Sequence, residues 1–407
     1  FWFSVSSLVC FTSSLSTVSL TLTGDVNLNP FLQSSQQSNF SFIWGDTLDF
    51  LRSSDTNLLA INHESTIAEV PNTKPATIQF QDPLHYIQTY GEAGANVGFM
   101  SVANNHQNDF TLAGLEHTLD LMQRNKLQFG GVASGAGAAA AVEAPRVVSV
   151  GSSGLKVAFF TMVVDECAVW PNGTLYLDHC TCGDNAGPSP PYQCYQANST
   201  MPGLWYTFGI TDSFVAYASG VVQRYKQSHP GQLVVAFLHV GPNFQWQPYP
   251  AHEQLLRNLS AAGADIVWGT SSHHLQRFEW FTPPAEEARS KPSPKPIIYG
   301  LGDLLFRHVP GVDDFCPLNV RPCEQFRPEL GLSYKFDISF DPANTQVSPV
   351  VWPSVAALGT KHSANQTFRV SNPEDVRWIT DIFNELSNAH GSAIKYHGNG
   401  EFQVDQL

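Results

Sequence analysis

Five residues that could ligate a metal ion each follow a different predicted strand of this chain: Asp25, Glu64, Asn105, His239 and His273. Carboxylate and amide oxygens mixed with imidazole nitrogens suit Mn, Fe or Zn better than Ca, which takes oxygen donors. Taken singly, each residue has an ordinary structural explanation as a turn, cap or loop residue. Their recurrence at five strand ends is the pattern that predicts a site for one or two divalent ions.

The clearest strand end is the apolar run 97–103 with the polar loop that follows it. This run carries almost no polarity, which is typical of a parallel strand covered on both faces. The loop contains Asn105, His106 and Asp109, and apolar residues at helical spacing then predict a helix over 112–124. Open α/β sheets bind their ligands at the carboxyl ends of strands, so this loop is predicted to lie in a binding site.

Further apolar runs predict the strands that carry the other candidate ligands. They are residues 18–23 before Asp25, 57–61 before Glu64, 233–238 before His239, and 265–268 before the loop that holds His273. Additional strands are predicted at 146–150, 155–164, 297–299, 332–340 and 347–351, and helices at 46–52, 84–90, 210–225, 251–261 and 373–386. The carboxyl ends of parallel strands meet at one edge of a sheet, so the five candidate ligands are expected to converge in one crevice.

The chemistry of such a crevice would be hydrolytic. In a two-metal site a carboxylate bridges ions about 3.5–4 Å apart, and a bound water becomes a hydroxide nucleophile near neutral pH. Glu64 is the expected bridging residue, and His106 is placed to stabilise or protonate a leaving oxygen. Asp109 is expected either to orient His106 or to cap the next helix. A serine hydrolase built on Ser271 and His273 is disfavoured, because the sequence has no G-x-S-x-G elbow.

Composition bounds the class of protein. The 407 residues allow two or three domains, or one large α/β domain with insertions. Hydrophobic residues make up 43% and aromatic residues 12%, which is ordinary for a globular chain. The net charge is −14 and there is no run of Lys or Arg, so a nucleic-acid partner is not expected.

The chain start and its cysteines predict a secreted or cell-surface protein. Residues 1–16 are apolar and rich in small residues, as at the end of a secretory signal peptide; the alternative is a first buried strand. No other segment is long and apolar enough to predict a membrane span. Sequons occur at Asn39, Asn172, Asn198 and Asn365.

The cysteines beyond the predicted signal number six, and an even number favours disulfides. They are Cys167, Cys180, Cys182, Cys194, Cys316 and Cys323. Four of them lie in a segment rich in Pro, Gly and Asn that we expect to be an insertion over 165–205. A zinc site is the disfavoured alternative, because Cys180 and Cys182 lack the usual Cys-x2-Cys spacing.

Six short motifs together resemble the bacterial capsule-synthesis family typified by CapA. They are G-D-V at 24–26, N-H-E at 62–64, A-N-N-H-x-x-D at 103–109, H-V-G-P-N-F at 239–244, G-A-D-I-V-W-G-T-S-S-H-H at 263–274, and Y-G-L-G-D at 299–303. The resemblance covers about residues 20–340 in the family's order. That family is associated with poly-γ-glutamate capsules and is similar to calcineurin-like metallophosphatases.

The resemblance implies an α/β fold of the four-layer αββα sandwich type, with two sheets between helices. The domain would span 17–341, include the Cys-rich insertion at 165–205, and carry a C-terminal strand and helix from 342–407 packed on it. By motif position, the resemblance makes His106 the catalytic-type residue. It makes the ligand-type residues Asp25, Glu64, Asn105, His239 and His273.

Three residues depart from the family pattern. Asn27 stands where metallophosphatases place a His, Thr270 replaces the first His of the G-H-S-S-H-H variant, and His63 replaces a usual Leu. The motifs predict a hydrolase that uses metal-activated water on a phosphoester, or on an amide of a polyanionic polymer; the departures favour a non-catalytic accessory protein that binds such a polymer outside the cell. A polyanionic substrate would need local positive charge from the metals or from residues such as Arg277 and Arg307.

Overall fold

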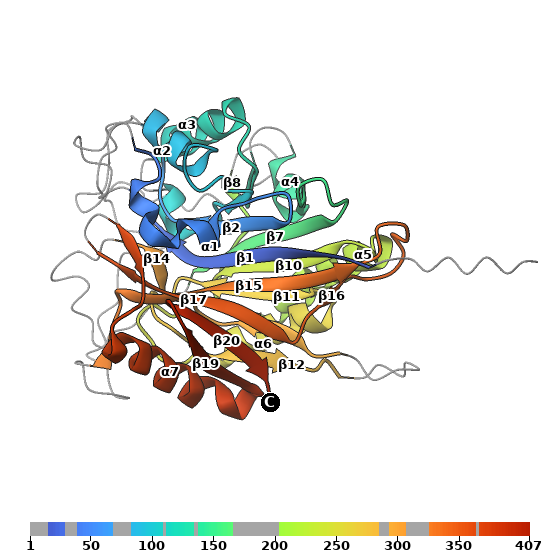
Figure 1. Cartoon of the computed structure of the whole chain (residues 1–407). Coiled ribbons are helices and arrows are strands. Elements are labelled where there is room, and N and C mark those ends of the chain that lie inside the picture. Colours follow the sequence, from blue (N-terminus) through green and yellow to red (C-terminus); the bar gives the residue numbers. More distant parts are fainter. Residues whose placement is uncertain are drawn as a thin grey trace, which may run out of the picture.

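The computed structural model describes residues 15–28, 39–67, 83–108, 111–133, 137–165, 203–284, 293–306, 325–363 and 366–407. Two large sheets form its centre, and helices lie around them (Figure 1). The α/β class predicted from the sequence is therefore confirmed. In the described ranges, no helix is both long and apolar enough to cross a membrane.

The larger sheet has eleven strands and is mixed. Its main path runs β19-β20-β17-β15-β1-β2-β3-β4, with β14 also paired to β1, β16 to β15 and β18 to β17. The strands are β1 (Ser16–Val26), β2 (Asn57–His63), β3 (Phe99–Ser101), β4 (Phe129–Gly130), β14 (Asp303–Leu305), β15 (Leu330–Phe340), β16 (Val350–Val351), β17 (Ser354–His362), β18 (Thr367–Arg369), β19 (Ser392–Gly398) and β20 (Glu401–Gln406). Strands β1 to β4 are parallel, so their carboxyl ends share one edge.

The smaller sheet has seven strands and runs β12-β13-β11-β10-β7-β6, with β9 paired to β7. Its strands are β6 (Arg146–Ser149), β7 (Lys156–Asp165), β9 (Tyr206–Phe208), β10 (Leu233–His239), β11 (Ile266–Thr270), β12 (Phe278–Phe281) and β13 (Lys295–Ile298). The central strands are parallel and the edge strands β6 and β12 are antiparallel. A separate two-stranded sheet pairs β5 (Val132–Ala133) with β8 (Gly203–Leu204).

The two large sheets pack against each other through apolar side chains. The rings of Phe99 on β3 and Phe159 on β7 stack with centroids 3.9 Å apart. The indole Nε1 of Trp268 on β11 donates a hydrogen bond of 3.0 Å to the carbonyl oxygen of Thr23 on β1. Because side chains alternate along a strand, the other face of β10 turns Val234 and Leu238 toward a second apolar cluster.

Helices pack against the sheets. The second apolar cluster contains side chains from α4 (Ala138–Glu143), α5 (Asp212–Ser228) and α6 (Pro250–Ala261), so these helices lie on the smaller sheet. Helices α2 (Pro83–Tyr90) and α3 (Thr111–Arg124) contribute buried side chains, among them Tyr90 and Leu115, to the apolar cluster that also contains Leu58 and Ile61 of β2. The remaining helical segments are η1 (Phe42–Thr47), α1 (Leu48–Leu51), η2 (Asn105–Asn108), α7 (Pro373–Ser387) and η4 (Asn388–His390).

The C-terminal part contributes more strands than the sequence predicted. We expected one strand and a helix in 342–407, but β16 to β20 join the larger sheet and α7 packs on β19. Strand β17 pairs with β15 and β20, so it continues the sheet rather than lying upon it. Strand β16 lies within the predicted strand at 347–351. Strand β20 was missed because its buried residues alternate with more exposed ones, whereas β17 contains four consecutive buried residues at 357–360, so its signal was overlooked.

Two further predictions fall largely on residues beyond the described ranges. All the cysteines, and residues 166–202 of the predicted Cys-rich insertion, lie outside the described residues. Residues 1–14 of the predicted signal segment do so as well. Strand β1 begins at Ser16, the last residue assigned to that segment, and Ser16 pairs with Phe340 of β15.

Candidate metal centre

The candidate centre lies where the two large sheets meet, and each sheet supplies a different kind of side chain. The larger sheet supplies acids: Asp25 near the end of β1, Glu64 directly after β2, and Asp303 at the start of β14. The smaller sheet supplies imidazoles, because His239 ends β10 and His273 lies just beyond β11. No single sheet therefore contains the whole centre.

Asp25 is fully buried at this junction. Its Oδ1 accepts a hydrogen bond of 2.7 Å from Asn62 Nδ2, and its Oδ2 accepts one of 3.0 Å from the backbone N–H of Ser271. Burial raises the pKa of Asp25 and the Asp303 carboxyl raises it further, while His273 and the two hydrogen bonds lower it; the net pKa lies above the ordinary value. A carboxyl group with this balance would be stabilised in its charged form by a nearby cation.

A glycine allows Asp25 and Asp303 to lie side by side. The two acids are register partners in the parallel pairing of β1 with β14. A Cβ at Gly24 would clash with the carbonyl oxygen of Gly302, so the strands can approach this closely only without a side chain at that position. The glycine of the G-D-V motif is thus explained by the packing of β14.

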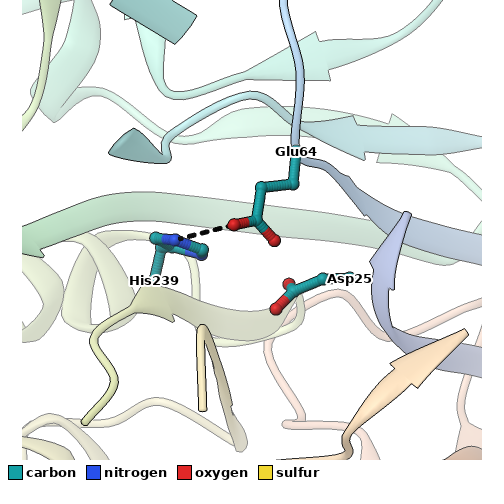
Figure 2. Close-up of side chains that lie close together, drawn as sticks. All are labelled: Asp25, Glu64 and His239. Carbon is teal, nitrogen blue, oxygen red and sulfur yellow. Dashed lines mark ion pairs between the residues drawn. The ribbon is translucent and has the colours of Figure 1, made fainter. Parts of the chain in front are cut away.

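Glu64 faces both histidines. Its side chain is 0% exposed, and its Oε1 lies 3.6 Å from Nε2 of His239 and 3.6 Å from Nε2 of His273. Figure 2 shows the carboxylate of Glu64 pointing between Asp25 and His239. A carboxylate in this position could contact an ion held by either histidine.

His239 is held by neutral groups on one nitrogen and faces the centre with the other. Its Nδ1 lies 3.1 Å from Thr270 Oγ1 and 3.2 Å from Asn62 Nδ2. Its Nε2 lies 2.8 Å from Asn105 Oδ1. Asn105 Oδ1 only accepts hydrogen bonds, so its contact with the imidazole is a hydrogen bond when Nε2 carries the proton. In the other tautomer Nδ1–H donates to the Thr270 hydroxyl and Nε2 has the lone pair that a metal ion requires. The threonine that departs from the family pattern therefore contacts the imidazole directly.

His273 is held by a carboxylate instead. Its Nδ1 lies 2.9 Å from Asp303 Oδ1 and 3.8 Å from Asp25 Oδ2. The rings of Phe244 and Phe306 lie 5.4 Å and 4.7 Å from the imidazole, measured between centroids. These contacts fix the ring in one orientation.

Left-handed backbone conformations gather around these side chains. Phe244, Ser271 and His273 have φ values of 56°, 82° and 50°, three of the six positive-φ non-glycine residues in the described chain. Hydrogen bonds hold them, because Phe244 N–H donates to the carbonyl of Ser272 at 2.8 Å and Ser271 N–H donates to Asp25. Such conformations cost free energy and persist where the surrounding structure enforces them, commonly at functional sites.

The donor set fits one or two divalent cations. Two groups of three side chains each place one donor atom per residue within 4.8 Å of the others: Asp25 with Glu64 and His239, and Asp25 with His273 and Asp303. All of these residues are buried, and burying several carboxylates is costly unless positive charge accompanies them. Carboxylate oxygen and imidazole nitrogen are donors that Mn, Fe and Zn accept.

The structure brings all five predicted ligand residues together around one point, including the half-buried Asn105. His106 lies at the rim, with its side chain 27% exposed and its Nε2 3.8 Å from Glu64 Oε1. Asp109 lies outside the described residues. The sequence analysis assigned no role to Asp303 or Asn62, although Asp303 ends the Y-G-L-G-D motif and Asn62 begins the N-H-E motif.

Arg277 is not available to a substrate, which corrects the expectation that it would supply local positive charge. Its side chain is 6% exposed, and its Nη2 lies 2.5 Å from Glu253 Oε2. Its guanidinium carbon lies 4.3 Å from the centroid of the Tyr299 ring. Arg277 is therefore buried and paired inside the protein. Arg307, the other residue expected to supply positive charge, lies outside the described residues.

The serine hydroxyls beside His273 point to other partners. Ser271 Oγ donates to Asn243 Oδ1 at 3.0 Å, and Ser272 Oγ donates to the carbonyl oxygen of His274 at 2.7 Å. Neither bond prepares a hydroxyl for attack through His273, which agrees with the absence of a nucleophile elbow in the sequence.

The fold and the centre define an α/β protein with a buried cluster of acids and histidines at the junction of two sheets. Residues 19–308 match the family model described as bacterial capsule synthesis protein PGA_cap, and the chain belongs to this family. The resemblance predicted from the six motifs is thereby confirmed.

Two curated relatives come from strains of Mycobacterium tuberculosis, and both are named "Probable polyglutamine synthesis accessory protein". Each is 25% identical to this chain over 354 residues, which cover 86% of the chain and 78% of the relative. The similarity therefore extends beyond the matched family region into most of the protein.

Proposed function

We propose that the protein is a metal-dependent hydrolase that cleaves a phosphoester, or an amide of a polyanionic polymer, with metal-activated water. One observation carries this proposal: buried acids from one sheet and histidines from the other converge, with Glu64 Oε1 at 3.6 Å from both His239 Nε2 and His273 Nε2. Purely structural ion pairs would not require two imidazoles to present the same nitrogen to one carboxylate.

Each residue of the centre would have its own role in such a reaction. Bound divalent ions would polarise the scissile group and supply a hydroxide nucleophile near neutral pH. Asp25, Glu64 and the two histidines would hold the ions, with Asn105 as a further oxygen ligand. His106 is half-buried and reaches Glu64, so it can donate a proton to the leaving oxygen from the open side of the centre. Asp109 would orient His106.

Further features belong to the same proposal. The metal would be Mn, Fe or Zn, the layers would be those of the metallophosphatase-like αββα sandwich, and the protein would act outside the cell or at its surface. The substrate would be a small molecule or a polyanionic polymer. The sequence supports the location through its sequons, its cysteines and its apolar start.

The test is hydrolysis by the full chain after metal removal and reloading. Chelator-treated protein would be supplied with Mn, Fe or Zn and assayed on an aryl phosphate monoester, an aryl phosphate diester and poly-γ-glutamate. We expect turnover that returns only with metal and falls by at least about a thousandfold in His239→Ala. His397→Ala, which removes an exposed histidine on β19, is the matched control and should retain full turnover. Equal turnover in both variants would exclude this centre.

A second candidate function is an accessory role in which the centre binds a polymer without cleaving it. The printed names of the two relatives favour it, as do Asn27 and Thr270, which stand where the resemblance to metallophosphatases and to the G-H-S-S-H-H variant implies histidine. Here poly-γ-glutamate should bind to the metal-loaded protein and remain intact on prolonged incubation. Release of shorter chains or of free glutamate would instead show that the protein is a hydrolase.

A further inference from the structure

The two halves of the candidate centre share two acids and differ in the rest. Asp25 belongs to both three-residue groups, and Glu64 lies equally close to the two imidazoles. We call the half with His273 and Asp303 the His273 side. We call the other half, with His239, Asn105 and Thr270, the His239 side.

The His273 side carries an additional full negative charge. Asp303 Oδ1 lies 2.9 Å from His273 Nδ1, and the Asp303 carboxylate is also within ligand distance of Asp25. If Asp303 ligates an ion itself, it adds a charged donor. If it instead holds the imidazole from behind, it fixes the ring and makes the other nitrogen a stronger donor. Both arrangements strengthen cation binding on this side.

The His239 side carries neutral groups in the corresponding places. Thr270 Oγ1 lies 3.1 Å from His239 Nδ1, and Asn105 Oδ1 lies 2.8 Å from His239 Nε2. A hydroxyl and an amide orient an imidazole and offer oxygen, but they contribute no formal charge. Coulomb attraction to a divalent ion in a buried site grows steeply with each carboxylate nearby, so this side is the weaker one.

We infer that the protein binds two divalent cations with unequal affinity, tightly on the His273 side and at least about tenfold more weakly on the His239 side. This inference rests on the proposed function and adds a form of regulation to it. At low metal concentration the protein holds one ion, and the second ion, beside His106, completes the hydrolytic centre only when metal is abundant.

The experiment is a stepwise metal titration of the chelator-treated full chain with Mn²⁺, followed by native mass spectrometry and titration calorimetry. We expect one ion to bind before the second, with dissociation constants separated by at least about tenfold. Two steps of equal affinity in the wild-type protein would overturn the inference and leave the proposed function standing.

Two substitutions assign the steps to the two sides. Asp303→Asn keeps the shape of the side chain and removes its charge, so it should weaken the first step by about 10–100-fold and bring the two steps together. Thr270→Val removes the acceptor for His239 Nδ1 and should weaken the second step by about 10–100-fold while leaving the first unchanged. The opposite assignment of effects would also overturn the inference.

A charge control and a folding control complete the design. Asp381→Asn removes one negative charge from an exposed position on α7 and should leave both steps unchanged. Circular dichroism confirms that each variant is folded before titration. Failure of the wild-type protein to bind any metal would overturn the proposed function as well, whereas two unequal steps without hydrolysis would leave the inference intact and point to the accessory role.

Discussion

The two large sheets contribute to the candidate centre in different ways. The larger sheet supplies acids and amides, of which Asp25 is common to both ligand groups, whereas the smaller sheet supplies His239 and His273. Neither sheet alone offers a complete set of donors. The centre therefore depends on the packing between the two sheets. Some substitutions should lower both the metal affinity and the stability of this packing, and others should lower only one of the two.

The strongest test of the comparison replaces Asp25, the acid common to both ligand groups, with asparagine. Asp25→Asn should weaken both metal-binding steps by at least about 100-fold, because both groups use this carboxylate. His239→Ala should abolish the second step alone. Titration calorimetry on the two variants separates these outcomes, and a first step that survives Asp25→Asn would break the proposed sharing.

The next largest effect should come from the apolar contact between the sheets. Phe159→Ala removes a buried ring that stacks on Phe99 at 3.9 Å, and we expect the free energy of unfolding to fall by about 3–5 kcal/mol. Urea denaturation measures the loss. Phe368→Ala is the matched control, because Phe368 is 40% exposed and its removal should change stability by less than about 0.5 kcal/mol.

A third substitution affects the larger sheet away from the centre. Burial raises the pKa of Asp375, but hydrogen bonds from Lys361 and Arg327 outweigh it, so the folded-state pKa lies below the ordinary value. The stabilisation is therefore present above about pH 4 and is lost as the pH falls below that. Asp375→Asn should lower the free energy of unfolding by about 2 kcal/mol at pH 7, with a difference that shrinks at pH 3.

Metal binding supplies the control for this third prediction. Both metal-binding steps of Asp375→Asn should match those of the wild-type protein at pH 7, because Asp375 lies on α7 and contacts β17 through Lys361. A loss of metal affinity in this variant would show that the C-terminal part positions the centre as well as the sheet.

The smallest expected effect concerns the hydrogen bond between the sheets. Trp268→Phe removes the Nε1 donor to the carbonyl of Thr23, two residues before Asp25, and should cost about 1 kcal/mol. Because the phenyl ring still fills part of the space, the metal affinity should change by less than about threefold. A loss of metal affinity that exceeds this limit would mean that this hydrogen bond positions Asp25.

Much of the fold could be predicted because its central elements bury continuous apolar surface. Strand β10 and helices α3, α6 and α7 were predicted to within a few residues, since each has an apolar run or helical periodicity of its own. Strand β3 is shorter than predicted, at three residues, although the N–H groups of Gly98 and Val102 on its two flanks still donate to the carbonyls of Leu59 and Gly130 on the neighbouring strands. The hairpin of β19 and β20 had a signal that was overlooked, the Gly398-Asn399-Gly400 turn with positive φ at each residue.

The centre was predictable where a ligand directly follows a strand. Glu64 and His239 stand at or just after the ends of β2 and β10, and that position alone located them. Asp303 follows the predicted strand at 297–299 but was given no role as a ligand, and its meeting with His273 depends on pairing between β14 and β1 that no local pattern encodes. His63 turns away from the centre and lies 2.7 Å from the hydroxyl of Tyr90, which the residue types of the N-H-E motif do not reveal.

Strand β1 has a consequence for the order in which the protein forms during synthesis. It is made before the other strands that the structure describes, yet its antiparallel partner is β15 and Asp25 pairs in register with Asp303 of β14. Pairings between segments so distant in sequence form late, because the intervening chain must first be made and brought together. A nascent chain that ends between His273 and Asp303 would carry both histidines without the acid that holds His273, so tight metal binding should mark the completion of the domain rather than its first folding steps.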